Sequence, residues 1–488
     1  MNGKVILVGA GPGDPGLLTV KSLAAIESAD VVVYDRLVSP AVMACIPEGA
    51  EKINVGKASS NHTVPQDEIN RILLYRAQEG KNVVRLKGGD PFMFGRGGEE
   101  LELLAQHGIP FEVVPGVTSA IAAPAYGGIP VTHRDFCSSL HIITGHARAG
   151  KPLEIDFAAL LRIGGTYVFL MGVAALPAIC AGLLDAGIDP DMPAALVENG
   201  TTPAQRRVNA TVGTLIETAK REKIKSPAII IVGKVCSLAD DFDWFDRLPL
   251  KGRKIIVTRP KERSGTLAHR LRSLGADVLE YPCIETAPMY ENAADAIRRI
   301  GDYEWIALTS PAGVGYLMEL ISRQNLDVRA LGGVKLAAIG QGTAQELRKF
   351  GLIADYVPET YDAEHLGAGL AVIAKGRVLI LRAQEGSPDL TAALDNYDDV
   401  ALYKTIYENP QSDELREMIA APTMVTFTSA STVKGFVSSV GEDADFSAVT
   451  GICIGKQTAA EAGKHGIRTV TARAAKIDEL VNTILEGI

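Results

Sequence analysis

Residues 85–97 constrain the fold of this chain more than any other stretch. An apolar run of strand character, 82–86, leads directly into a loop rich in glycine, and residues 99–107 then follow an amphipathic helical pattern. Glycines leave backbone atoms uncovered, so a ligand can approach them closely. A strand, a glycine-rich loop and a helix in this order are typical of an open α/β sheet, which binds ligands at the carboxyl ends of its strands. The stretch therefore predicts an α/β fold with a ligand site at 88–97.

Charged side chains accompany the same loop. Arg85, Lys87 and Arg96 bring cations to it, and Asp90 and Glu99 bring anions. Opposite charges interleaved with glycines exceed what a tight turn requires. We therefore expect these five side chains at the edge of the ligand site.

A second glycine-rich loop, 9–16, follows the opening strand 4–8. It does not fit the dinucleotide fingerprint G-x-G-x-x-G, because the third glycine position is Asp14. Pro12 and Pro15 also stiffen the loop. We interpret it as a fixed wall of a ligand site and not as a pyrophosphate cradle.

Two further strands end in charged residues. Asp35 follows the apolar run 30–34, and Lys57 follows the run 52–55. A single residue of this kind is usually a solvated cap, but the carboxyl ends of parallel strands meet at one edge of a sheet. Asp35 and Lys57 are thus predicted to gather with the two glycine-rich loops.

The composition changes near residue 115, where an alanine-rich helix begins. Strands are then expected at 141–144, 166–171, 194–198, 207–211 and 228–232. Two of them end in stretches with small or polar residues, Met171-Gly172 and Ala195–Thr201, the second of which contains Gly200. We predict two α/β lobes, 1–115 and 116–245, with a cleft between them.

A series of motifs runs in order through residues 1–245: VGAGPGDPGLLT, VVYDRLVS, VGK, RLKGGDPFMFGRGGEE, VVPGVTSA, GIPVTHRD, TGH, MGV, ALVENGT and SPAIIIVGKV. With them the segment resembles the uroporphyrinogen-III C-methyltransferases, which have the tetrapyrrole methylase fold. The resemblance implies that S-adenosyl-L-methionine binds between the lobes and leaves as S-adenosyl-L-homocysteine. It also implies a proton acceptor at Asp35 and a proton donor at Lys57. The implied cofactor contacts are Pro12, Gly88, Gly89, Asp90, Met93, Thr118, Ser119, Met171 and Gly200.

Methyl transfer from a sulfonium depends mainly on alignment and on exclusion of water. A proton must leave the macrocycle afterwards, so the site also needs a base, for which Asp35 is one candidate. Arg96 and Arg134 are expected to bind the acetate and propionate groups of the substrate, because arginine pairs with carboxylates through two hydrogen bonds. Glu99 is expected to orient Arg96 or a pyrrole N–H. Local cations of this kind let a chain of net charge −9 bind a polyanion.

Residues 246–252 are predicted to link two separately folded halves, since they follow an acidic stretch and precede a fresh strand. Beyond this linker the sequence repeats itself. Strand 255–259 with a helix to 274 corresponds to strand 378–382 with a helix to 394. Strand 305–309 corresponds to strand 424–428, and strand 335–339 corresponds to strand 451–454. Two copies of one α/β unit imply two lobes with a crevice between them.

The repeat places four turns rich in Ser, Thr and Gly at the crevice, and they contain Ser310, Thr343, Ser429 and Thr458. Hydroxyls and free N–H groups at helix N-termini are able to hold carboxylates. Ordinary capping explains any one such turn, whereas four related turns favour a ligand with several acidic groups.

The motifs of this half are VTRP, LTSPAGV, IGQGTA, LYKT, FTSAS and IGKQTA. Through them it resembles uroporphyrinogen-III synthase. The resemblance implies one lobe of 253–283 with 405–488 and another of 288–400. It also implies closure of hydroxymethylbilane to uroporphyrinogen III with inversion of the last ring. Tyr403 then matches the proton donor of that family, and Thr343 and Thr458 match its hydroxyl-bearing turns.

Composition narrows the partners. The negative net charge disfavours a nucleic-acid partner. No apolar run approaches the roughly 18–20 residues of a membrane span, so we expect a cytoplasmic protein. Its expected partners are small-molecule tetrapyrrole substrates. The six cysteines form no CxxC pair, which favours reduced thiols. His133, His141 and His146 lack a carboxylate or thiol at a ligand spacing, so no metal is expected. The first resemblance implies a homodimer through residues 1–245.

The leading hypothesis is a bifunctional enzyme whose second half makes uroporphyrinogen III and whose first half methylates it at C-2 and C-7 to precorrin-2, for sirohaem or cobalamin synthesis. One alternative moves the methyl acceptor to a later precorrin or to ribosomal RNA. The continuous RLKGGDPFMFGRGG and the lack of a basic surface weigh against RNA. Another alternative makes residues 253–488 a non-catalytic module that senses tetrapyrroles.

Overall fold

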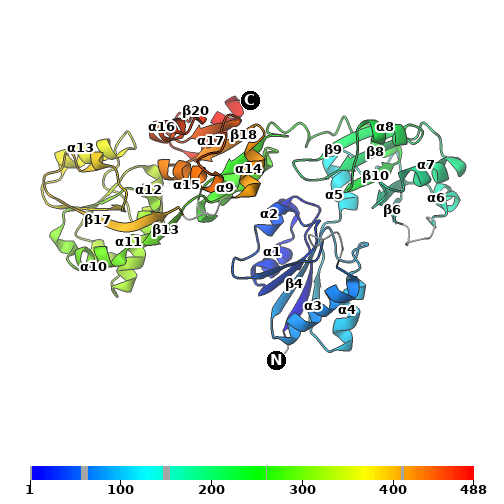
Figure 1. The fold of residues 1–488 in the computed structure, drawn as a ribbon, viewed down its shortest axis with the longest axis horizontal. Helices are drawn as coiled ribbons and strands as arrows, with labels where there is room; N and C mark the ends of the chain where they lie inside the picture. The colour runs from blue at the N-terminus through cyan, green and yellow to red at the C-terminus, as the bar shows by residue number, and fades with distance from the viewer. Residues whose placement is uncertain (1–2, 57–63, 147–153, 260, 408–411, 488) are drawn as a thin grey trace. The chain divides into compact units, whose positions relative to one another are not determined.

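The chain folds into two compact units, Met1–Gly252 and Arg253–Ile488. Each unit contains two five-stranded sheets (Figure 1). The structure, a computed structural model, describes residues 3–56, 64–146, 154–259, 261–407 and 412–487. In this part of the chain no helix is long and apolar enough to cross a membrane.

The first sheet has the strand order β3-β2-β4-β1-β5, and all its neighbouring strands are parallel. Its strands are β1 (Lys4–Gly9), β2 (Val31–Tyr34), β3 (Glu51–Asn54), β4 (Asn82–Lys87) and β5 (Phe111–Val114). Its helices are η1 (Pro15–Leu17), α1 (Val20–Glu27), α2 (Pro40–Met43), α3 (Gln66–Gln78) and α4 (Gly97–Gln106). Since every strand runs the same way, the carboxyl ends of β1, β2, β4 and β5 share one edge, as predicted.

Alternation along the strands separates two cores in this lobe. Val84 and Leu86 of β4 join one apolar cluster with α1 and α2. Val83 joins the other cluster with α3 and α4, which lie beside β4 in Figure 1. Arg85 and Lys87 share the face of Val83, so they project under α3 and α4 and not toward the loops.

The second sheet has the order β6-β7-β10-β8-β9 and is mixed: only β6 and β7 are parallel. Its strands are β6 (Leu140–Thr144), β7 (Thr166–Leu170), β8 (Pro193–Glu198), β9 (Arg206–Thr211) and β10 (Ala228–Val232). Its helices are α5 (Ser119–Tyr126), α6 (Phe157–Ile163), α7 (Leu176–Asp185), α8 (Leu215–Arg221) and η2 (Lys234–Leu238).

Residues 246–252, predicted as a linker, belong to the first compact unit. Leu250 is fully buried and Phe245 nearly so. The Lys251 amine lies 3.9 Å from the centre of the Phe245 ring and 3.1 Å from the Asp246 carboxylate. These contacts fix the segment against its own unit.

The second unit has sheets of order β12-β11-β18-β19-β20 and β13-β17-β16-β14-β15. The strands are β11 (Lys254–Val257), β12 (Asp277–Glu280), β13 (Glu285–Pro288), β14 (Trp305–Leu308), β15 (Lys335–Ala338), β16 (Val378–Ala383), β17 (Tyr397–Ile406), β18 (Thr423–Phe427), β19 (Val449–Cys453) and β20 (Arg468–Thr471). The helices are α9 (Lys261–Ser273), α10 (Tyr290–Arg298), η3 (Ile300–Asp302), α11 (Pro311–Arg323), η4 (Val328–Leu331), α12 (Gln341–Lys349), α13 (Ala363–Ile373), η5 (Pro388–Leu390), α14 (Asp413–Ile419), α15 (Ala430–Val440), α16 (Lys456–Lys464) and α17 (Ile477–Glu486).

The two sheets repeat one topology. Under the predicted correspondence, the order β12-β11-β18-β19 matches β17-β16-β14-β15. A parallel bridge between Ala337 and Tyr356 takes the place of β20, and β13 adds an antiparallel edge to the second sheet. The first sheet of this unit therefore joins strands that are distant in the sequence, β11 and β12 with β18 to β20.

The copies differ after the first strand of each. The thirteen-residue α9 follows β11, but only the three-residue η5 follows β16, so the helix predicted up to residue 394 is wrong. The reason lies in Gly386-Ser387-Pro388: Ser387 caps η5, and the Arg382 side chain occupies the space beside Gly386, where a Cβ would be 2.5 Å away. Pro and Gly break a helix at this position.

Candidate active sites

Three glycines pack the loops of β1, β4 and β5 against one another. A Cβ on Gly9 would lie 2.5 Å from the Gly116 Cα, and one on Gly116 would lie 2.3 Å from the Gly89 carbonyl oxygen. The Gly89 N–H donates to the Gly11 carbonyl at 2.7 Å, and the Gly11 N–H donates to the Gly89 carbonyl at 3.2 Å. Any side chain at Gly9 or Gly116 would push these backbones apart.

Gly89 itself leaves an open space. Its φ is +69°, and a Cβ there would have no neighbour closer than 3.9 Å. Gly88 is different, because a Cβ on it would meet the Leu37 side chain at 2.7 Å. Met93 and Met171, both predicted contacts, are 37% and 50% exposed. The turn thus offers uncovered backbone and thioether side chains to a ligand.

Asp90 holds the loop in shape. Its Oδ1 accepts hydrogen bonds from the N–H groups of Phe92 and Met93, at 2.9 and 3.1 Å. Its Oδ2 accepts one from the Gly116 N–H at 3.0 Å. Asp90 therefore ties the β4–α4 loop to the start of the second lobe. On that side, Thr118 caps α5 by accepting from the Ala120 N–H at 3.3 Å, and Ser119 is the first residue of the helix.

Strained backbone occurs at strand ends of both lobes. Five non-glycine residues have φ between +50° and +70°: Phe94 and Arg96 in the β4–α4 loop of the first lobe, and Met171, Asn199 and Thr201 after β7 and β8 of the second. Each of these residues except Asn199 costs on the order of 1 kcal/mol or more, because asparagine adopts this conformation more readily. For β-branched Thr201 the conformation is unusual, and it is held by the Gln205 side chain, which accepts from the Thr201 N–H at 2.8 Å. Strain of this kind often marks a binding site.

The two lobes of the first unit meet at the proline-containing loop. The Asp14 N–H donates to the Thr201 hydroxyl at 3.2 Å, and the Tyr126 hydroxyl donates to the Asp14 carboxylate at 2.7 Å. Burial and the neighbouring Asp14 raise the pKa of Tyr126. Next to this contact Gly13 lies against Thr202, and Pro12 is half-buried. The loop is thus held in place at the junction of the lobes.

Gly200 lies at the end of β8, at the same junction. A Cβ on it would be 2.4 Å from the Ala123 Cβ of α5. The side of Gly200 that a Cβ would occupy faces helix α5, so the close packing of β8 against α5 requires a glycine here.

Arg96 and Glu99 pair with each other at the start of α4. The Arg96 Nε and Nη2 donate to the two Glu99 oxygens at 3.0 and 2.6 Å. This pairing raises the pKa of Arg96 and lowers that of Glu99. Both side chains are more than half exposed, and Arg134 is exposed as well. These charges are accessible to an anionic ligand.

Asp35 is partly exposed at the end of β2. Its Oδ1 accepts from the Leu37 N–H at 3.0 Å, and its Oδ2 lies 3.7 Å from the Arg85 guanidinium. Lys57, the predicted partner in proton transfer, lies outside the described residues.

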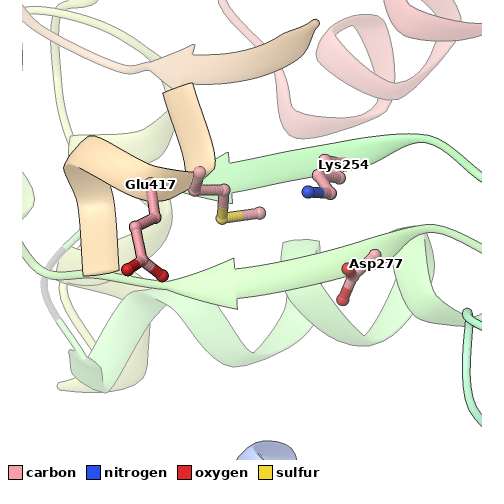
Figure 2. A pocket seen from close by; sticks show the side chains of 4 residues that line it. Lys254, Asp277 and Glu417 are labelled. Carbon is pink, nitrogen blue, oxygen red and sulfur yellow. The ribbon is translucent and has the colours of Figure 1, made fainter. Parts of the chain in front are cut away.

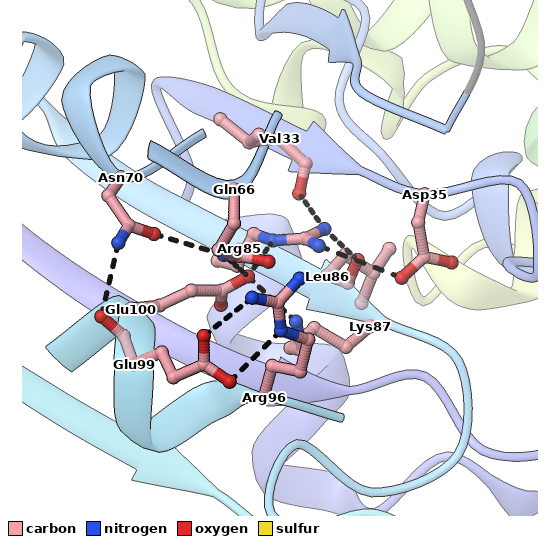
Figure 3. A network of polar contacts seen from close by, with 10 residues as sticks. All are labelled: Val33, Asp35, Gln66, Asn70, Arg85, Leu86, Lys87, Arg96, Glu99 and Glu100. Carbon is pink, nitrogen blue, oxygen red and sulfur yellow. Dashed lines mark hydrogen bonds and ion pairs between the residues drawn. The ribbon is translucent and has the colours of Figure 1, made fainter. Parts of the chain in front are cut away.

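Arg85 and Lys87 do not lie at the edge of the loop, so that expectation is wrong. They are 3% and 5% exposed and bind the fully buried Glu100 of α4 (Figure 3). Residues two apart on a strand share a face, and here that face is covered by helices. Arg85 and Lys87 are two residues apart on an otherwise apolar strand. This pattern could have predicted that both cations are buried beside a carboxylate.

In the second unit, Tyr403 and Ser310 come together from different elements. Their hydroxyl oxygens are 2.7 Å apart, and the Tyr403 side chain is only 6% exposed. Ser310 also caps α11 by accepting from the Gly313 N–H at 3.0 Å. The Tyr403 hydroxyl therefore lies at a helix N-terminus, whose dipole favours negative charge.

The four predicted turns fall into two kinds. Ser310 and Ser429 are N-caps of α11 and α15, and Ser429 forms a capping box with Thr432. Thr343 and Thr458 lie in the first turns of α12 and α16 and are 2% and 4% exposed. The N-cap residues of these helices, Gly340 and Gly455, provide no side-chain cap. Each lobe has one turn of each kind, so the repeat extends to the capping pattern.

A separate hollow of about 280 Å³ is lined by Lys254, Asp277, Glu417 and Met418 (Figure 2). Burial raises the pKa of Asp277, against the effect of Lys254. Lys254 and Asp277 begin β11 and β12, so this hollow lies at the opposite ends of the strands from the predicted turns. Within the described ranges no group of three or more His, Cys, Asp or Glu residues could hold a metal ion.

Family models match both parts of the chain. The tetrapyrrole (corrin/porphyrin) methylases match residues 4–216, and uroporphyrinogen-III synthase HemD matches residues 265–482. The porphyrin biosynthesis protein HemD of Ruminiclostridium josui is 52% identical over 495 residues, which cover 99% of this chain and 98% of that protein. The uroporphyrinogen-III C-methyltransferase of Bacillus subtilis strain 168 is 42% identical over 354 residues, 72% of each protein.

Among solved structures, the uroporphyrin-III C-methyl transferase of Thermus thermophilus, crystallised with S-adenyl homocysteine, is 44% identical with a TM-score of 0.42, and the match covers 48% of this chain and 100% of that one.

The fold and the family matches together define a two-part α/β enzyme. The chain belongs to the family of porphyrin biosynthesis proteins that join a tetrapyrrole methylase domain to a uroporphyrinogen-III synthase domain. It is a bifunctional protein of tetrapyrrole biosynthesis. Both resemblances and the α/β fold are thereby confirmed, and the roles of individual site residues stay predictions.

Proposed function

We propose that residues 253–488 close hydroxymethylbilane to uroporphyrinogen III and that residues 1–252 then methylate it twice, at C-2 and C-7, to precorrin-2. Membership of a family with both domains supports the pair of activities. The observation that carries the methyl transfer is the β4–α4 turn, where a Cβ on Gly89 would have no neighbour closer than 3.9 Å.

The residues of this edge fit S-adenosyl-L-methionine. The side of Gly89 that a Cβ would occupy is open, so a ligand can approach the backbone of the turn closely. Met93 and Met171 are exposed enough to contact an adenosine moiety. The residues that would hold the cofactor are Pro12, Gly88, Gly89, Asp90, Met93, Thr118, Ser119, Met171 and Gly200.

S-adenosyl-L-methionine would supply an activated methyl group to a pyrrole carbon of the substrate. The chain aligns the acceptor, excludes water and removes a proton. Asp35 accepts the proton that the methylated macrocycle loses. Arg96 and Arg134 bind the carboxylates of the substrate, and Glu99 holds Arg96 in a suitable orientation.

In the second unit, the chemistry needs one proton donor and a surface that fixes the conformation of a flexible chain. The linear tetrapyrrole loses hydroxide, and Tyr403 donates the proton that makes this group leave as water. Ser310 supports Tyr403 through their shared hydrogen bond. The turns that contain Thr343, Ser429 and Thr458 bind the acetate and propionate groups.

The test is chromatography with mass spectrometry of the product formed by purified protein from hydroxymethylbilane and S-adenosyl-L-methionine, since the products with and without ring inversion have the same mass. We expect a macrocycle that has gained two methyl groups. A methylated product without ring inversion would identify residues 253–488 as a sensor and not a synthase. Methylation of a later precorrin, with uroporphyrinogen III unchanged, would overturn the proposed acceptor.

The proposed assembly is a homodimer through residues 1–252. Light scattering on the purified protein tests it, and a monomer at micromolar concentration would contradict it.

A further inference from the structure

Glu100 is a fully buried carboxylate at the centre of a polar cluster in the first lobe (Figure 3). Its Oε1 accepts from the Lys87 amine at 2.8 Å, from the Arg85 Nε at 3.2 Å and from the Gln66 amide at 3.2 Å. Its Oε2 is buried and has no hydrogen-bond partner in the part of the chain that the structure describes. Burial of so many charges is expensive, and a simpler apolar core would serve stability equally well.

This cluster reaches the candidate methylation site. Arg85 lies opposite Val33 in the register of β4 with β2, and Asp35 follows the end of β2. The Arg85 Nη2 is 3.7 Å from the Asp35 Oδ2, while the Arg85 Nε is bound to Glu100. One guanidinium therefore connects the buried carboxylate to the partly exposed one.

Lys87 is a second cation within electrostatic range of Asp35. Burial and the neighbouring Arg85 lower the pKa of Lys87, and Glu100 acts in the opposite direction. Glu100 is thus the group that keeps the Lys87 ammonium paired inside the lobe. If Glu100 were neutral, Asp35 would remain as a carboxylate beside Arg85 and within electrostatic range of Lys87.

We propose that Glu100 is a positioning residue for methyl transfer, which neutralises Lys87 and holds Arg85 so that Asp35 stays available to accept a proton. This role rests on the proposed function, in which Asp35 is the base. Glu100 acts through Arg85 and Lys87, since it is fully buried.

The first test is Glu100→Gln in the full-length protein. The amide oxygen still accepts from Arg85, but Lys87 loses its counter-charge and competes for Asp35. We expect kcat for methylation of uroporphyrinogen III to fall on the order of 10²-fold, the effect of displacing a reacting group by about 1 Å. The KM for S-adenosyl-L-methionine and the affinity for S-adenosyl-L-homocysteine should not change.

The decisive variant is the double substitution Lys87→Met with Glu100→Gln, which removes one cation and one anion. Without the competing ammonium, kcat should recover to within about tenfold of the wild type. A role in packing alone predicts the opposite, because two substitutions in one core then lower activity at least as much as one. Glu102→Gln, exposed on the same helix, is the matched control.

Each outcome is informative. A double variant as inactive as Glu100→Gln would overturn the proposal, as would a Glu100→Gln enzyme with normal kcat. If Glu100→Gln fails to fold, a double variant whose kcat is more than about tenfold below that of the wild type still overturns the proposal. A wild-type protein that forms no methylated product would refute the proposed function separately.

Discussion

The two units build their candidate sites in different ways. In the first unit, glycines allow three loops to touch backbone to backbone, and a buried charge cluster lies beneath them. In the second, repeated turns present hydroxyls and helix N-termini, and their residues cap helices or pack under them. The difference corresponds to the two proposed tasks. An activated methyl group needs a fixed, closely approached backbone, whereas ring closure needs a surface that shapes a flexible polyanion.

Gly116→Ala is expected to have the largest effect. Its Cβ would lie 2.3 Å from the Gly89 carbonyl, so the loops must separate, at a cost of about 1–3 kcal/mol or more. Calorimetric titration should show loss of S-adenosyl-L-homocysteine binding, while the synthase activity remains. Gly98→Ala is the control, because Gly98 has open space around it. Equal binding by Gly116→Ala and the wild type would contradict the backbone-packing account.

Tyr403→Phe tests the proposed proton donor of the second unit. Loss of its hydroxyl should lower the rate of uroporphyrinogen III formation on the order of 10²-fold or more, the usual contribution of a positioned proton donor. The assay is separation of isomers I and III by chromatography. Methylation of supplied uroporphyrinogen III should not change. An unaltered rate would assign the proton transfer to another group.

Arg96→Ala should weaken tetrapyrrole binding and spare the cofactor. Hydrogen bonds to charged groups contribute about 1.5–3 kcal/mol, so the KM for uroporphyrinogen III should rise about 10- to 100-fold. Arg71→Ala, exposed on α3, provides the control. Equal loss of S-adenosyl-L-methionine and tetrapyrrole binding would rule out a specific role for Arg96.

Ser429→Ala should have the smallest effect. It removes the cap and the capping box of α15, and such changes cost about 1 kcal/mol. Gly455→Ser makes the opposite change, because it adds a side-chain cap to α16, which has none. It should raise the free energy of unfolding by a few tenths of a kcal/mol at most. Scanning calorimetry of the full chain measures both. A Ser429→Ala protein as stable as the wild type would show that the cap contributes little.

Local patterns predicted most of the strands. The buried run Ala228–Val232 has the expected bounds, because continuous apolar residues between turn signals define it. The antiparallel pairing of β10 with β7 and β8 was not predicted, since pairing direction depends on distant contacts. The shared topology of the two sheets in the second unit was predicted from the internal repeat, because the chain could be compared with itself.

The candidate sites were predicted in part. The glycine-rich loops and Asp35 were placed at one edge because parallel topology requires it. Glu100 was missed, although its neighbour Glu99 was named, because the register of a helix on a sheet decides which of two adjacent carboxylates is buried. The packing roles of Gly9 and Gly200 were missed as well, since sequence alone does not tell which neighbour a glycine faces.

The contact of Tyr126 with Asp14 has a practical consequence for spectroscopy. The Trp244 indole lies edge-on to the Tyr126 ring, with centroids 4.9 Å apart, and is 49% exposed. The chain's other tryptophan, Trp305, is 4% exposed in the second unit. The emission of each indole therefore reports on one unit, and in a Trp305→Phe protein the remaining signal would follow the lobe junction at Asp14 without an added dye.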